Sequence, residues 1–172
     1  MMNYFDLTVP VMLKNLTNVK SILMRGWNDA QERGMTEEAF LAQTLAPDMF
    51  HLGRQIQIVT DNAKGMAARL AGVEAMSIED NETTVDELLN RIDVVIEYIS
   101  TFKPEQFEQA AQQKIVLKYM PGQYQTGADY VLFFAIPNFF FHMSMIYALL
   151  RKQGVALGKM DFIGGLTLHP LA

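Results

Sequence analysis

The stretch from Asp129 to Arg151 is the feature that most constrains the fold of this chain. It reads DYVLFFAIPNFFFHMSMIYALLR, and no residue from Tyr130 to Leu150 carries a formal charge when His142 is neutral. A helix that is apolar on every side must be buried all round, inside either a protein or a bilayer. We therefore expect this segment to form the most buried helix of the chain.

The length of this uncharged run raises the question of a membrane span, because about 20 apolar residues suffice to cross a bilayer. Pro137, Asn138 and His142 lie near the centre of the run, where hydrocarbon penalises polar groups most. The flanking charges Asp129 and Arg151 form no basic anchor. We expect the buried centre of a soluble bundle rather than a membrane helix.

The composition fits one globular domain over residues 1–172 with a sizeable core. Half of the residues are hydrophobic, the net charge is −5, and the 14 basic residues are scattered, which argues against nucleic acid as a partner. The chain has no cysteine, so disulfides, thiolate metal ligands and a cysteine nucleophile are excluded. No signal peptide is recognisable at the start of the chain, and the cytoplasm is the expected compartment.

Apolar stripes at helical spacing predict further helices before the uncharged run. The first begins near Thr8, with Pro10 in its first turn, and ends at Gly34. Another begins at a capping box formed by Thr84 and Glu87, which is a two-way hydrogen-bonded helix start.

The cleanest stripe belongs to a second helix that lies between these two and starts at Pro47-Asp48. Its apolar residues recur in alternating steps of three and four, as in a bundle seam; they are Met49, Leu52, Ile56, Val59, Ala63, Met66 and Leu70. At about 100° per residue, Asp48 and Gln55 lean towards the seam and His51 lies on its flank. Arg54 and Asp61 point away from it.

A small hairpin is predicted between the third helix and the uncharged run. Residues 114–119 are rich in β-forming side chains, and they are separated from residues 123–127 by a Pro-Gly turn. The last helix then runs from Asp129 to Lys152, and Pro137 should kink it. The predicted fold is an all-α four-helix bundle with a short β-hairpin before the last helix.

Asn138 and His142 are the polar residues of the last helix that could carry chemistry, since a four-residue spacing places them on one face. A His beside an Asn can bind a divalent metal, or position a water or a substrate. A zinc or nickel ion needs further His or carboxylate ligands, and here His51 and Asp48 would have to supply them. The alternative is a structural pair that satisfies backbone groups freed by Pro137.

A small-molecule site is the other use we expect for these polar residues. The side chains predicted to line it are Asn138, His142, Gln55 and Tyr147.

Five motifs, in order along the chain, resemble one bacterial family of unknown function; they are LAPDMF (45–50), ARLAG (68–72), IPNFFFH (136–142), YALLR (147–151) and GKMDFIG (158–164). That family is placed among the DinB/YfiT-like proteins, a superfamily regarded as metalloenzymes. The resemblance covers nearly the whole chain and implies a four-helix bundle of DinB type, often dimeric. A homodimer is also expected because the last helix is apolar on more sides than its neighbours can cover.

In the wider superfamily, a metal is typically held by one His from the second helix and a HxxxH pair from the fourth. The matching pair here is Asn138 and His142, and the only His of the second helix is His51, where this branch more usually has Pro. Two interpretations stay open. The protein is a small-molecule-binding or structural bundle with a degenerate metal site, or it is a divalent-metal enzyme, a thiol transferase or hydrolase. Whether it is an enzyme is not decided by the sequence.

Overall fold

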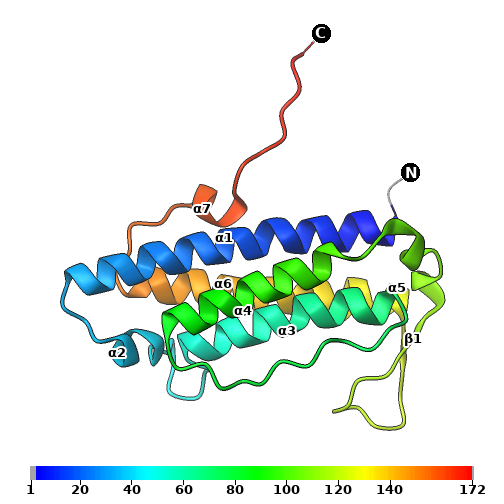
Figure 1. The fold of residues 1–172 in the computed structure, drawn as a ribbon, viewed down its shortest axis with the longest axis horizontal. Helices are drawn as coiled ribbons and strands as arrows, with labels where there is room; N and C mark the ends of the chain where they lie inside the picture. The colour runs from blue at the N-terminus through cyan, green and yellow to red at the C-terminus, as the bar shows by residue number, and fades with distance from the viewer. Residues whose placement is uncertain (1–2, 172) are drawn as a thin grey trace.

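The computed structural model describes residues 3–171, and four long helices form its body (Figure 1). They are α1 (Tyr4–Glu32), α3 (Leu52–Leu70), α4 (Val85–Ser100) and α6 (Ile136–Lys152). The short helix α2 (Glu37–Leu41) lies at one end of the bundle and the hairpin at the other (Figure 1). Helix α7 (Lys159–Ile163) packs on α1. The four-helix bundle predicted from the apolar stripes is confirmed.

The start of α1 differs from the prediction. The helix begins at Tyr4 rather than near Thr8, because Asn3 and Asp6 form a capping box that satisfies the first backbone N–H groups. Pro10 consequently lies inside the helix, beyond its first turn. For α4, by contrast, the predicted capping box of Thr84 and Glu87 is confirmed; both reciprocal bonds are present.

The start of α3 also differs, and here the difference affects a candidate site residue. The helix begins at Leu52 because His51 is its N-cap, with the ring Nδ1 accepting a hydrogen bond of 3.2 Å from the backbone N–H of Arg54. Pro47 and Asp48 therefore belong to the turn before the helix. The seam from Leu52 to Leu70 is buried along its whole length, as predicted.

The expectation that the last helix is the most buried one is wrong. Most residues of α3 are buried. In α6 fewer than half are buried; they are Phe139, His142, Met143, Ile146, Leu149 and Leu150. The arrangement of the helices explains this, since α1 and α3 contact each other across the bundle while α6 packs mainly on these two. Its outer face is left uncovered, and Phe141 is 51% exposed.

The segment from Gly127 to Lys152 is one continuous helical run made of α5 (Gly127–Tyr130), a π-helical turn (Val131–Ala135) and α6. By length and composition it could cross a membrane, but its contacts with α3 and α1 make it part of the bundle. The π-helical turn ends two residues before Pro137, where we predicted a kink. Such a turn changes the hydrogen-bond register next to the residue that has no N–H to donate.

The hairpin is shorter than predicted. Strand β1 (Lys114–Ile115) pairs antiparallel with β2 (Gln125–Thr126), with Lys114 opposite Thr126. The Pro-Gly pair lies in the loop between the strands. Gly127 follows at a point of close approach, where a Cβ atom would lie 1.7 Å from the carbonyl oxygen of Ala110. The hairpin is thus fixed against the end of the bundle.

Candidate functional site

The interface between α3 and α6 holds four polar side chains arranged as two pairs. His142 Nδ1 lies 2.7 Å from Gln55 Oε1, and both residues are buried. About two turns further along α3, Asn138 Nδ2 donates to Asn62 Oδ1 over 2.6 Å. The prediction that Gln55 faces inward is therefore correct, and its partner is His142.

The hydrogen bonds of Gln55 determine which ring nitrogen of His142 carries the proton. The Gln55 amide nitrogen donates to the carbonyl oxygen of Phe50 over 3.2 Å, so the amide oxygen must face the ring. An amide oxygen only accepts; hence His142 Nδ1 donates and, in the neutral ring, Nε2 keeps a lone pair. Burial, aided by the nearby charge of Arg54, holds the pKa of His142 below its usual value. The neutral ring is the favoured form.

The second pair is less buried. Asn138 is half-buried, and the amide nitrogen of Asn62 donates to the carbonyl oxygen of Ile58 within its own helix at 2.9 Å. The Asn62 amide oxygen is thereby turned towards α6. Asn138 thus contacts a side chain of α3 rather than backbone groups freed by Pro137, which was the structural role considered from the sequence.

The structure does not bring Asp48 and His51 together with His142. Both are exposed at the start of α3, and His51 uses its Nδ1 to cap the helix. Gln55, one turn into the helix, occupies the position that faces His142. Within residues 3–171, no three His, Asp or Glu side chains are grouped so that they could hold a metal ion.

Tyr147, the fourth residue predicted for a small-molecule site, lies apart from these pairs. Its hydroxyl donates to the carbonyl oxygen of Leu157 at 3.4 Å, and its ring meets that of Phe162 edge to face. The two rings line a shallow hollow of about 260 Å³ beside α7, together with Ser144 and Lys159. Tyr147 therefore contributes to the docking of the C-terminal segment.

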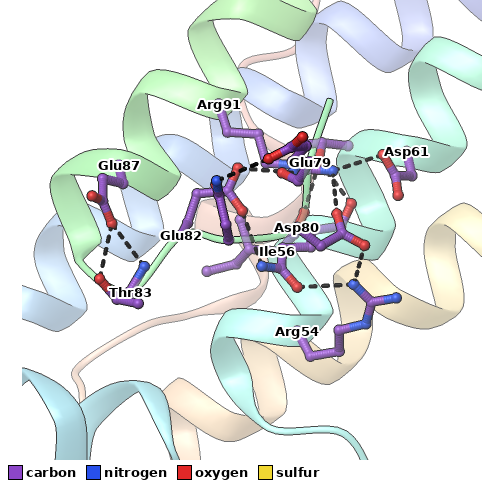
Figure 2. Close-up of polar contacts among 12 residues, drawn as sticks. Arg54, Ile56, Asp61, Glu79, Asp80, Glu82, Thr83, Glu87 and Arg91 are labelled. Atoms are coloured by element: carbon purple, nitrogen blue, oxygen red, sulfur yellow. Dashed lines mark hydrogen bonds and ion pairs between the residues drawn. The ribbon is translucent and has the colours of Figure 1, made fainter. Parts of the chain in front are cut away.

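The other face of α3 carries a charged cluster that the sequence analysis missed (Figure 2). Arg91 of α4 is its centre, and the side chain is only 1% exposed. Its guanidinium donates to Asp61 Oδ1 at 2.7 Å and to Glu82 Oε1 at 2.8 Å. It also contacts Asp80 at 2.8 Å, and its Nε donates to the hydroxyl of Thr60. Arg91 thus ties α3 and the loop before α4 to α4.

Neighbouring side chains complete this Arg91 cluster. Arg54 pairs with Asp80, Lys64 pairs with Asp61 at 3.0 Å, and the amide of Gln57 donates to Glu82 Oε2 at 2.9 Å. Burial raises the pKa of Asp80, but the hydrogen bonds and charges of Arg54 and Arg91 outweigh it and hold that pKa below its ordinary value. The carboxylate is therefore ionised when the cluster is intact.

A signal for this cluster was present in the sequence. Arg91 lies three residues after Leu88 and four before Val95, which places it within the apolar stripe of α4. A charge at such a position needs partners, and the acidic loop residues Glu79, Asp80 and Glu82 stand a short distance before it. Arg54 and Asp61 do point away from the seam, as predicted, and they point towards this loop.

The fold is that of a DinB-like helical bundle. A crystal structure of a DinB family member protein from Shewanella denitrificans superposes with a TM-score of 0.93 and 36% sequence identity, over 97% of this chain and 95% of that one. The family described as domain of unknown function (DUF1993) matches residues 4–163, and the chain belongs to this family. No match was found among curated proteins.

Proposed function

We propose that this protein is a small-molecule-binding helical bundle without metal-dependent catalysis. The observation that supports the proposal is the Gln55–His142 pair at 2.7 Å. Where a metal site between α3 and α6 would need a His or carboxylate facing His142, α3 supplies an amide. An amide oxygen is a weak ligand for zinc or nickel beside imidazole and carboxylate. Asn138 adds a second amide on α6, already paired with Asn62.

The alternative is a divalent-metal enzyme of DinB type, a thiol transferase or hydrolase, and one observation favours it. The Gln55 oxygen holds His142 with the proton on Nδ1, which leaves the Nε2 lone pair available. Metal-bound His residues are commonly oriented in this way by a hydrogen bond to the other nitrogen. A zinc or nickel ion would take His142 as its first ligand, and the remaining ligands would have to come from side chains that rearrange.

Elemental analysis of protein purified without a His tag separates the two functions. We expect far less than one metal ion per chain and no change in melting temperature on adding zinc or nickel. About one ion per chain, with a stabilisation that grows with the logarithm of free metal and is lost in His142→Ala, would establish the enzyme alternative. His169→Ala is the matched control, because His169 is exposed in the C-terminal segment.

We also propose that the chain forms a homodimer in the cytoplasm through the outer face of its last helical segment. Phe133 is 73% exposed, Leu132 57% and Phe141 51%. Large exposed apolar side chains in one area are typical of interaction surfaces.

Light scattering tests the dimer and should give a mass twice that of one chain, which is 19.5 kDa. Phe133→Glu should give the monomer, and Leu168→Glu, in the exposed C-terminal segment, should leave the dimer intact.

A further inference from the structure

A cleft at the α2 end of the bundle lies apart from the Gln55–His142 and Asn62–Asn138 pairs and shares only Glu82 with the Arg91 cluster. It has a volume of about 470 Å³, within the range of ligand sites in proteins. Helix α2, the start of α3 and the loop before α4 form its walls. The lining residues are Glu38, Leu41, Ala42, His51, Gly53, Glu82 and Thr83.

The charges of this cleft are all negative. Two of its lining residues, Glu38 and Glu82, are carboxylates, and the lining contains no Lys or Arg. Glu82 is already neutralised by Arg91 at 2.8 Å. Glu38 makes no side-chain hydrogen bond or ion pair with any residue of the described chain, 3–171, and it is exposed. Glu38 is thus a free carboxylate at the edge of a largely apolar hollow.

The positive ends of α3 and α4 also lie near the cleft and oppose this charge, and Glu38 itself lies in the first turn of the five-residue helix α2. The partial positive charge at the N-terminus of α4 is offset by Glu37, whose carboxylate accepts a hydrogen bond of 2.6 Å from the backbone N–H of Val85. At α3, the His51 ring accepts from the N–H of Arg54. A helix dipole is equivalent to roughly half a charge at its end. The full charge of Glu38 therefore exceeds the partial charge at the start of either α2 or α3.

We propose that this cleft binds a small organic amine with an apolar body. The ammonium group would pair with Glu38, and the body would lie against Leu41, Ala42 and the His51 ring. The proposal rests on the small-molecule-binding function above and gives its ligand a chemical class and a place. It differs from the site predicted from the sequence, because His142 pairs with Gln55 and Asn138 pairs with Asn62 at the α3–α6 interface, and none of the four lines the cleft.

Three probes of one shape test the charge preference: benzylamine, benzyl alcohol and benzoate, each titrated into the full chain and followed by NMR chemical shifts. We expect benzylamine to bind with the largest shifts at Leu41, His51 and Gly53, and the neutral and anionic probes to bind more weakly. Glu38→Gln should weaken benzylamine binding by about fivefold, the upper end for an exposed ion pair. Glu105→Gln, an exposed carboxylate near the other end of α4, should change nothing.

Ala42→Trp provides an independent test, since Ala42 is exposed and a large ring there should fill the cleft without disturbing the core. Loss of benzylamine shifts in this variant supports the site. Equal binding of all three probes, no effect of Glu38→Gln, or no binding of benzylamine would overturn the amine proposal. None of these results changes the metal content, so the proposed function is judged separately. Shifts centred on Tyr147 would place small-molecule binding elsewhere and overturn this cleft.

Discussion

Towards α6, helix α3 presents the neutral amides Gln55 and Asn62, and each meets one side chain of the neighbouring helix. Towards α4 it presents charges, and these join a network in which the cations and carboxylates are equal in number: Arg54, Lys64 and Arg91 against Asp61, Asp80 and Glu82. Two faces of one helix thus bury polar groups in different ways.

The difference shows what each kind of burial demands. A neutral amide pair loses little when both members become apolar, because no group is left unsatisfied. A buried charge requires nearly complete pairing, since removing one member leaves the others uncompensated in a poorly solvated place. The Arg91 cluster is therefore the more vulnerable of the two regions, and the α6 face is the more tolerant.

Arg91→Met should give the largest effect, a loss of about 3–5 kcal/mol of unfolding free energy, which is typical when one partner of a buried ion pair is removed. Urea denaturation followed by circular dichroism measures it. Arg25→Met is the matched control, because Arg25 pairs with Asp161 on the surface and should lose at most about 1 kcal/mol. Equal losses in the two variants would show that the Arg91 cluster is not a special feature of the fold.

His142→Leu alone should cost about 1–3 kcal/mol, because the buried oxygen of Gln55 is left without a donor. Adding Gln55→Leu should recover most of this loss, since both polar groups are then gone. The same denaturation experiment decides the outcome. A double variant less stable than the single one would mean that the two side chains stabilise the fold by more than their mutual hydrogen bond.

Asn138→Ala should have a smaller effect, about 0.5–1.5 kcal/mol, because the Asn62–Asn138 bond is neutral and half-buried. Asn62→Ala in the same background should add less than it costs alone, because the Asn62–Asn138 bond is already lost and only the bond from Asn62 to the Ile58 carbonyl remains to be removed. Fully additive losses would show that the Asn62–Asn138 bond contributes nothing to stability.

The pH dependence of stability should separate the two faces by pH range, since both lose stability as the pH falls. The pKa of His142 is lowered by burial and by Arg54, so its contribution is complete above the unfolded value of about 6.5 and is lost as the pH falls through the folded pKa. The pKa of Asp80 is also lowered. Its contribution is therefore complete above about 4 and lost at still lower pH.

Unfolding free energies measured from pH 7 downward should show these two losses in turn. The Gln55→Leu/His142→Leu variant should lack the upper loss, whereas Arg91→Met should reduce the lower one. If the double variant kept the full decline between pH 7 and 5, His142 would not be the group that titrates there.

The sequence predicted the four helices because each carries an apolar stripe that only burial explains, and it identified Gln55 as inward-facing from the helical angle alone. Helix starts were less predictable. His51 resembled an ordinary residue on the flank of the seam. Its role as N-cap depends on where the turn after α2 ends and the helix begins, which the apolar stripe does not fix. Asn3 and Asp6 could have been recognised as a capping box from their spacing.

The burial of the last helix could not be predicted from its own residues. Hydrophobicity predicts how much surface a helix needs to cover, but the neighbours available depend on which helices meet across the bundle. Here α1 and α3 are the helices that meet across the bundle. The sequence showed that Arg91 needs partners but not which ones, because a loop rather than a helix supplies three of them.

The Arg91 cluster also has a consequence for the order in which the chain assembles during synthesis. Arg91 and Asp61 are 30 residues apart, whereas His142 and Gln55 are 87 apart. Closing the shorter loop costs about 0.9 kcal/mol less chain entropy. The ribosome releases α3, the acidic loop and α4 well before α6, because synthesis runs from the N-terminus. Arg91 can therefore hold α3 against α4 while the last helix is still being synthesised. The amides of Gln55 and Asn62 are then already positioned on α3 when α6 packs against it.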